Sequence, residues 1–313
     1  MQIRESLGRD VIRLIFWYPA RWLILALPLE WGIGVMRMMG DMHYLAGRGL
    51  PGLLRNNLAR IKGDSAYGPE GSKTAREYLQ MHYVDRLSIL LFPRMGAREV
   101  ERLIEFEGLE RLKAGLDKGK GVVLVHGHFG PALVPLVALA RLGFPMKQVG
   151  FPSDEGLSWI GRNVAFRLRM KYEAMMPAQV VMADAFMRPV FKWLSGNGVI
   201  MITGDGSGTE KKLGKQETLT FHGQPVMFPL GPAILAAKTG AELIPMFITP
   251  GEKKPFKIVM EDPIRIEGNG DETFSAAMKN FARLLEQYTA RYPAYMRFLD
   301  RFSPGALIEE PDR

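Results

Sequence analysis

Two histidines separated by a single glycine are the residues with the clearest chemical potential in this sequence. The chain contains five histidines and no cysteine, which excludes a thiolate nucleophile and leaves histidine as the side chain best suited to proton transfer near neutral pH. His126 and His128 follow a short run of β-branched residues and precede a Gly-Pro turn. Catalytic groups in open α/β sheets gather beyond the carboxyl ends of the strands. The pair is therefore the first candidate for a catalytic base, with a purely structural role as the alternative.

Short apolar runs alternate with helical patterns from residue 119 onward, and this alternation indicates how the pair is positioned. Buried strands are predicted at 121–126, 199–203 and 243–248. Helical patterns occupy 132–142, 157–169, 183–194 and 273–291. Strands that alternate with helices form a mostly parallel sheet with helices packed on it.

The part of the chain before residue 110 is predicted to be mostly helical. Helix signals occur over 50–61 and again from residue 72, on either side of a turn-rich break at 63–69. We therefore predict an α/β protein in two parts. A helical, membrane-associating region spans residues 1–110, and an α/β domain spans residues 111–313.

Basic residues are concentrated at the start of the chain. The formal net charge is +8, and residues 1–62 supply +5 of it, with nine basic residues against four acidic ones. Aromatic side chains such as Trp22 and Trp31 are interleaved with these bases, a pattern that suits the headgroup region of an anionic membrane better than nucleic acid. The longest charge-free run within residues 1–62, Trp22 to Leu29, is much shorter than the roughly 20 apolar residues of a spanning helix. We expect the segment to lie on the membrane, the alternative being a core-packing helix.

Four segments of the sequence match the motifs of a known family in the family's order. They are Leu50–Leu58, Glu107–Gly130, Gly198–Asp205 and Phe221–Pro245. With its Glu-Gly-Leu-Glu, Gly-Lys-Gly-Val and His-Phe-Gly motifs, the second segment resembles the bacterial lipid A biosynthesis lauroyl/myristoyl acyltransferase family, within the lysophospholipid acyltransferase superfamily. The likeness extends from about residue 45 to 300.

The resemblance implies a reaction and its participants. Members move a fatty acyl chain from a thioester, carried by acyl carrier protein or coenzyme A, to a hydroxyl of a glycolipid or related lipid, without a metal or redox cofactor. Their signature is a histidine, four further residues and then an acidic residue. The neutral histidine takes the hydroxyl proton while the acid orients the imidazole. His128 falls on the signature histidine, and the resemblance implies a peripheral or monotopic protein on the cytoplasmic face of the inner membrane.

The acidic residue of that signature is absent from this chain. Leu133 stands in its place, and counting from His126 instead leads to Pro131. Three interpretations follow. Asp205, at the end of a strand expected to neighbour the strand of His128, supplies the acid, and this is the preferred interpretation. Alternatively, His126, on the same strand face, orients His128, or the site is inactive and the protein is a lipid-binding relative.

Phosphate groups on the substrates would need cationic or backbone N–H partners. The glycine-rich segment 204–215 does not have the spacing of a phosphate loop. Its lysines Lys211, Lys212 and Lys215 nevertheless suit phosphates on a carrier or on the acceptor lipid. Gly231 opens a helix that could present backbone N–H groups to an anion, and Arg167 belongs to a short basic cluster. A solvated loop and a structural helix start are the alternatives.

A metal-dependent hydrolase is the competing enzyme class. The spacing of His126 and His128 recurs among zinc ligands. Such sites need further histidines and bridging carboxylates, and His222 is the only histidine that follows the pair. The sequence therefore favours an acyltransferase over a metalloenzyme.

Overall fold

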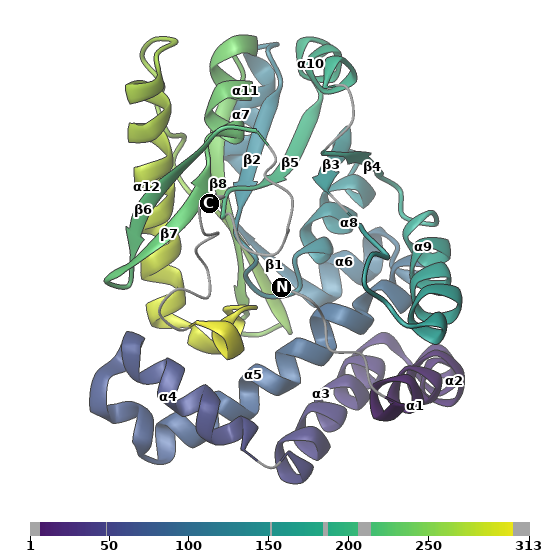
Figure 1. Ribbon diagram of the computed structural model, residues 1–313. Helices are drawn as coiled ribbons and strands as arrows, with labels where there is room; N and C mark the ends of the chain where they lie inside the picture. The colour runs from purple at the N-terminus through teal and green to yellow at the C-terminus, as the bar shows by residue number, and fades with distance from the viewer. Residues whose placement is uncertain (1–6, 48, 151, 184–186, 206–213, 303–313) are drawn as a thin grey trace.

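A seven-stranded sheet forms the centre of the protein in the computed structural model, which describes residues 7–47, 49–150, 152–183, 187–205 and 214–302 (Figure 1). Its strand order is β1-β9-β8-β2-β5-β3-β4. The strands are β1 Ile104–Glu107, β2 Val122–His126, β3 Met146–Gly150, β4 Gln179–Met182, β5 Val199–Thr203, β8 Glu242–Pro250 and β9 Phe256–Met260. All neighbouring pairs are parallel except β8 and β9, which run antiparallel. The predicted α/β class with a mostly parallel sheet is confirmed.

The three strands that we predicted are central ones. Every residue of β2 is buried, and β5 and β8 are buried over most of their length. Strands covered on both faces by helices read as continuous apolar runs, which is why the sequence reveals them. The strands that we did not predict include edge strands with polar residues, and β1 lies inside the region that we expected to be helical.

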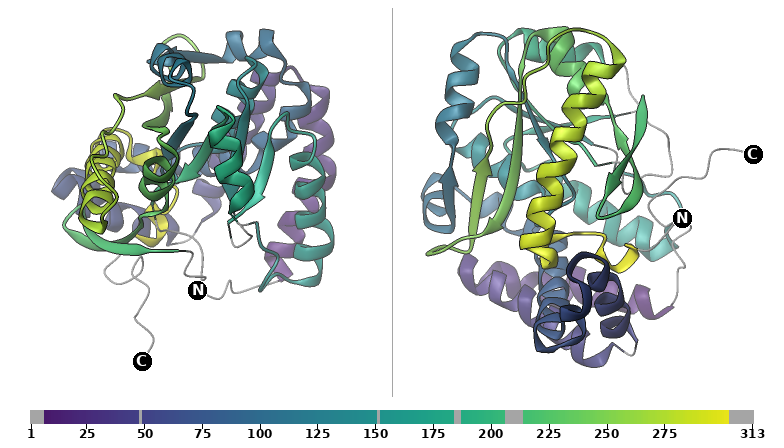
Figure 2. Two further views of the ribbon diagram at one scale, coloured as in Figure 1. Left: turned by 90° about the horizontal axis from the view of Figure 1, so that it is seen from above. Right: turned by 90° about the vertical axis from the view of Figure 1, so that its left-hand side faces the viewer.

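Helices cover the sheet on both sides and connect its strands. They are α7 Leu109–Asp117, α8 Leu133–Arg141, the π-helical turn Gly161–Phe166 continuing into α9 Arg167–Glu173, α10 Arg188–Ser195, α11 Gly231–Thr239 and α12 Asp271–Arg291. Helix α11 packs on β2, α10 on β5 and α8 on β3. The long helix α12 runs beside an antiparallel hairpin formed by β6 Gln216–Phe221 and β7 Gln224–Pro229 (Figure 2).

The hairpin is closed by His222 and Gly223, both of which have positive φ, 47° and 71°. A two-residue turn of this kind matches the twist of the flanking strands, and it requires the left-handed conformation at both positions. The hairpin packs against α12, and it carries two buried phenylalanines, Phe221 and Phe228.

A layer of helices lies across one end of the sheet (Figure 1). It consists of α1 Leu7–Ile15, a π-helical turn Phe16–Ala20, α2 Arg21–Ala26, α3 Leu29–Ala46, α4 Leu50–Lys62, the 3-10 turn Gly63–Tyr67 and α5 Pro69–Leu87. Helix α6 Ala97–Leu103 follows this layer and packs on α8 and β1. Helices α3 and α5 approach closely at Gly40, where an added Cβ would lie 2.4 Å from the Cα of Gln80. Among the helices that the structure describes, none combines the length and the apolar composition needed to cross a bilayer.

Candidate active site

His128 and Asp205 lie together at the carboxyl ends of two neighbouring strands. Strands β2 and β5 pair in register, with His126 opposite Thr203, and each chain continues for two residues to reach His128 or Asp205. The Nδ1 atom of His128 lies 2.7 Å from Oδ1 of Asp205. The backbone N–H of His128 donates to Oδ2 of the same carboxylate, also at 2.7 Å. Asp205 thus holds both the ring and the backbone of His128.

The electrostatics of the pair keep the Asp205 carboxyl ionised. Burial alone would raise the pKa of the Asp205 carboxyl, but the charge and hydrogen bonds of His128 outweigh burial, so this pKa is lowered. An ionised carboxylate only accepts hydrogen bonds, so Nδ1 of the neutral His128 ring carries the proton that Asp205 accepts. The lone pair then resides on Nε2. This arrangement is that of a general base oriented by an acid.

The two side chains line a small, mostly apolar hollow that is partly open to solvent. Its other walls come from the β6–β7 hairpin, from α12 and from the segment that follows α12. They include Phe221, Phe228, Leu285, Met296 and Phe298. The ring of Phe298 meets the ring of His128 edge to face, with centroids 5.1 Å apart. The base therefore faces an apolar space.

The chain after α12 forms one wall of the hollow and is bonded to the loop that carries His128. The backbone N–H of Arg297 donates to the carbonyl of His128 at 3.0 Å, and that of Gly130 donates to the carbonyl of Tyr295 at 2.7 Å. Gly130 has φ +63°, and an added Cβ would lie 2.7 Å from the Tyr295 ring. We call residues 293–302 the C-terminal strap. On its other side, the hydroxyl of Tyr78 in α5 donates to Asp300 at 2.7 Å.

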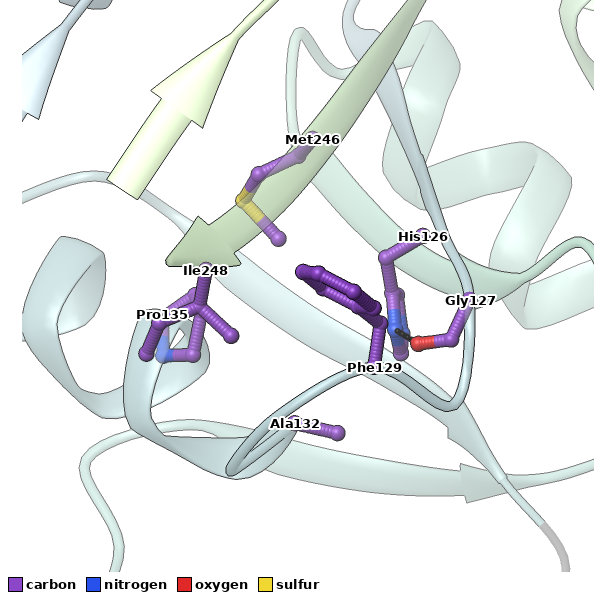
Figure 3. Close-up of a pocket in the computed structure, with 7 residues that line it drawn as sticks. All are labelled: His126, Gly127, Phe129, Ala132, Pro135, Met246 and Ile248. Atoms are coloured by element: carbon purple, nitrogen blue, oxygen red, sulfur yellow. Dashed lines mark hydrogen bonds between the residues drawn. The ribbon is translucent and has the colours of Figure 1, made fainter. Parts of the chain in front are cut away.

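His126 occupies a different environment from His128. Its side chain is buried, and its Nδ1 lies 3.0 Å from the carbonyl oxygen of Gly127, a bond drawn in Figure 3. Its Nε2 lies 3.4 Å from the side-chain nitrogen of Gln148. Burial, as the largest cause, lowers the pKa of His126 to about 4. Both ring nitrogens are engaged in these contacts, so neither of them is directed at the ring of His128. If His126 orients His128, the alternative that we derived from the sequence, it does so through the backbone and not from ring to ring.

A second, even smaller hollow lies against His126. Its lining is otherwise apolar and consists of Gly127, Phe129, Ala132, Pro135, Met246 and Ile248 (Figure 3). The loop 126–129 therefore separates two apolar spaces. His126 faces one of them and His128 faces the other.

Leu133 is the first residue of α8, so the position of the signature acid is a helix start without a carboxylate. A carboxylate reaches that helix start from another element. Oδ1 of Asp85, in α5, accepts a bond from the backbone N–H of Ala132 at 3.3 Å, and its Oδ2 lies 3.5 Å from Nε of Arg297. Sequence reasoning missed Asp85, because nothing in the sequence links α5 to this loop.

The residues predicted to bind phosphate lie away from the hollow where the structure describes them. Lys215 pairs with Asp271 at the start of α12. Gly231 is the first residue of α11, and Arg167 is an exposed residue at the start of α9. Lys211 and Lys212 lie outside the described residues. None of the three described residues lines the hollow.

Three arginines that we did not predict lie near it instead. The guanidinium carbons of Arg297 and Arg301 lie 5.8 and 5.9 Å from the ring centre of Phe298, which itself contacts His128. Arg86, in α5, is exposed and makes no hydrogen bond or ion pair with a residue that the structure describes. We call Arg86, Arg297 and Arg301 the arginine group. In the sequence, the run Arg-Phe-Leu-Asp-Arg at 297–301 could have pointed to two of its members.

The geometry does not bring the two histidines of the pair onto a common metal position. His126 directs its nitrogens at Gly127 and Gln148, whereas His128 directs Nδ1 at Asp205. Among the described residues, no three histidine or acidic side chains gather closely enough to hold a metal ion. The contacts therefore favour acid–base chemistry at His128.

A family model described as bacterial lipid A biosynthesis acyltransferase matches residues 9–303. The chain belongs to this family. The resemblance drawn from the sequence motifs is thereby confirmed, and membership supports an acyltransferase that acts on lipid.

Two similar proteins carry the name phosphatidylinositol mannoside acyltransferase. Both are from Mycobacterium tuberculosis, one from strain H37Rv with 29% identity over 212 residues and one from strain CDC 1551 with 27% identity over 211 residues. Each alignment covers 65% of this chain and 62% of the relative, so the chain spans less than two thirds of the length of these relatives. They place this chain among proteins named for lipid acylation.

Proposed function

We propose that the protein transfers a fatty acyl chain from an acyl thioester to a hydroxyl of a glycolipid or phospholipid in membrane lipid biosynthesis. The observation that carries the proposal is the His128–Asp205 pair at the wall of an apolar hollow. Nε2 of His128 takes the proton of the acceptor hydroxyl as the oxygen attacks the thioester carbonyl carbon. A C–O bond forms, the C–S bond breaks, and the imidazolium returns the proton to the departing thiolate. Asp205 stabilises the imidazolium in between.

The proposed donor is an acyl chain carried by acyl carrier protein or coenzyme A, and no metal or redox cofactor enters the reaction. The apolar walls of the hollow support binding of a hydrocarbon chain next to the base. Family membership supports the acyl transfer, and the thioester is the part of the proposal that an assay must establish.

The arginine group is our proposed site for a substrate phosphate, in addition to the lysines Lys211, Lys212 and Lys215 that the sequence indicated. Three guanidinium groups around Phe298 and α5 supply bidentate donors that suit phosphate oxygens. Arg86 lies close enough to Arg297 for their like charges to repel each other, and a bound anion would relieve this repulsion.

We further propose that the protein acts at an anionic membrane surface, as a peripheral or monotopic protein on the cytoplasmic face of the inner membrane. Large apolar side chains are exposed along α1 to α3, among them Leu7, Trp22 and Trp31, which are 87%, 62% and 70% exposed. The guanidinium of Arg21 lies 4.6 Å from the ring centre of Trp22. Aromatic rings beside basic groups suit the headgroup region of a bilayer, and nucleic acid is not a proposed partner.

The proposal is tested by measuring acyl transfer from acyl-carrier-protein and coenzyme A thioesters to lipid acceptors, using wild type, His128→Ala and Asp205→Asn. We expect kcat to fall roughly 10²- to 10⁴-fold in both variants, since the first removes the base and the second removes the charge that orients it. His43→Gln, whose histidine contacts Tyr83 in the helical layer at 3.2 Å, is the matched control and should retain activity. Equal rates in wild type and His128→Ala would contradict the proposal. They would favour the alternative suggested by Leu133 in the place of the signature acid, namely an inactive relative that binds lipid.

The phosphate site is tested by comparing an acceptor that carries a phosphate, 1-acylglycerol phosphate, with its phosphate-free counterpart, 1-acylglycerol. Arg86→Gln and Arg301→Gln should raise KM for the first acceptor roughly tenfold or more, because hydrogen bonds to charged groups contribute about 1.5–3 kcal/mol each. KM for the second acceptor should stay unchanged. Arg98→Gln, at an exposed position in α6, is the control. A KM that rises equally for both acceptors would contradict a contact with the acceptor phosphate. The donor is tested in the same way, by comparing an acyl-coenzyme A with an acyl-pantetheine, which lacks the nucleotide phosphates. A KM that rises only for the coenzyme A donor would assign the site to the donor.

A further inference from the structure

The peptide bond between Gly127 and His128 is held from both sides. Its carbonyl oxygen, that of Gly127, lies 3.0 Å from Nδ1 of His126. Its N–H, that of His128, donates to Asp205 at 2.7 Å. This peptide carries the Cα of His128, so its orientation fixes the direction from which the imidazole reaches Asp205. His126 and Asp205 thus form hydrogen bonds to the two opposite ends of the same peptide group.

The contacts of His126 define a single tautomer. A carbonyl oxygen only accepts, so the proton of the neutral ring must be on Nδ1, which leaves the lone pair on Nε2. Nε2 faces the side-chain nitrogen of Gln148 at 3.4 Å, and that nitrogen also donates to the carbonyl of Val149 at 2.9 Å. Because the Val149 carbonyl accepts this bond, it is the amide nitrogen and not the amide oxygen of Gln148 that faces His126. Every contact in the chain from Val149 to Gly127 therefore agrees with an Nδ1–H donor.

The surroundings keep this donor in place across the working pH range. His126 is only 5% exposed, and burial, as the largest cause, lowers its pKa to about 4, so the ring stays neutral near pH 7. Gly127 is packed tightly, since an added Cβ would lie 2.7 Å from Leu285 and 3.3 Å from Oδ2 of Asp205. The loop has little room to move, and the bond from His126 restrains it on the side that Asp205 does not reach.

We propose that His126 is a positioning residue, which orients His128 by hydrogen bonding the carbonyl of the Gly127–His128 peptide. The proposal rests on the proposed function of His128 as the base, and it adds a second support to that of Asp205. Leu133 replaces the acid of the family signature, so the loop of His128 contains no carboxylate that could orient the imidazole. The orientation of the imidazole therefore depends on how the backbone of the loop is held. A displacement of about 1 Å at a reacting group costs on the order of 10²-fold in rate.

Two variants of similar polarity separate this role from a merely structural one. In H126N the amide nitrogen can occupy the position of Nδ1 and keep the bond to Gly127. In H126Q the amide reaches the position of Nε2 instead, keeping the contact with Gln148 and losing the bond to Gly127. Two readouts apply: the steady-state constants kcat and KM, and the NMR resonance of the His128 Nδ1 proton, which its bond to Asp205 shifts downfield. The second readout needs no turnover, so it decides the positioning role even if wild type fails to transfer an acyl group.

We expect H126N to retain kcat within about threefold, and H126Q to lose roughly tenfold to hundredfold in kcat with KM nearly unchanged. The His128 Nδ1 proton should keep its downfield position in H126N, and in H126Q it should move upfield or broaden. A wild-type kcat and resonance in H126Q would overturn the proposal, as would equal losses of kcat in both variants. If H126Q does not fold, Gln148→Met releases His126 from its other side. That variant should perturb the same resonance, and an unperturbed resonance would count against the proposal.

Discussion

At the scale of single residues, the site shows how a histidine and a carboxylate can be paired although the acid of the family signature is missing. The family signature places the acid on the helix that follows the histidine, and here that position is Leu133. Asp205 supplies the carboxylate from the neighbouring strand, and it binds the backbone N–H of His128 as well as the ring. One carboxylate therefore both orients the base and fixes the loop that carries it.

Burial of His126 has a consequence for stability that depends on pH. Its pKa is about 4 in the folded protein against 6.5 for an exposed histidine, so between these values the unfolded chain binds a proton that the folded chain does not. The free energy of unfolding should therefore fall as the pH drops from about 6.5 to 4, by up to about 3 kcal/mol for this residue. Urea denaturation at pH 7.5 and pH 4.5 measures the effect.

His126→Asn removes this titration, so the variant should lose less stability than wild type between the two pH values. His43, His82 and His222 also have lowered pKa values, with burial as the largest cause, and they should leave a residual acid sensitivity in the variant. An identical pH dependence in wild type and variant would contradict a buried neutral His126.

At the scale of elements, the amino-terminal helices combine a buried face with an exposed apolar one. Ile24, Ile33 and Met36 belong to the hydrophobic core, whereas Trp22 and Trp31 on the same helices are largely exposed. Exposed apolar side chains that gather on one surface are typical of sites that contact another protein or a membrane. The helices therefore have the two-sided character expected of a segment that packs on protein and meets lipid.

Replacing both exposed tryptophans should weaken binding to membranes. We expect the Trp22→Ala/Trp31→Ala double variant to bind phosphatidylglycerol vesicles roughly tenfold more weakly or worse, since each ring gives up apolar surface that a bilayer would bury. Co-sedimentation with vesicles measures the change. Tyr67→Ala, at an aromatic that is 55% exposed but outside α1 to α3, should bind like wild type. Unaltered binding of the double variant would assign these tryptophans another role.

The contact between α3 and α5 offers a matched pair of glycines. An added Cβ at Gly40 would lie 2.4 Å from the backbone of Gln80, while one at Gly34 would have no atom within 4 Å. Gly40→Ala should therefore lower the free energy of unfolding by several kcal/mol, because two helices must move apart. Gly34→Ala should raise it by about 0.5–1 kcal/mol through helix propensity. Thermal unfolding distinguishes the two, and equal shifts in Tm would refute the close approach.

At the scale of the whole molecule, the sequence predicted the parts of the fold that bury continuous apolar runs. Strands β2, β5 and β8 were recognised for this reason, and the rule that catalytic groups gather at strand ends led to both His128 and Asp205. Strand β3, with Lys147 and Gln148 in its middle, was missed because its pattern is mixed. The arginine group was missed because α5 and the C-terminal strap lie more than 200 residues apart in the chain, and only the tertiary fold brings them together.

The C-terminal strap has a bearing on how the two predicted regions relate. It bonds to the loop of His128 on one side, and on the other its Leu299 carbonyl accepts a bond from Asn57 in α4 at 2.8 Å while Tyr78 binds its Asp300. The strap therefore connects the amino-terminal helices to the loop of His128 through hydrogen bonds on both of its sides. Under the proposed function, a movement of the helical layer at a lipid surface would shift the strap and, through it, the loop that carries His128.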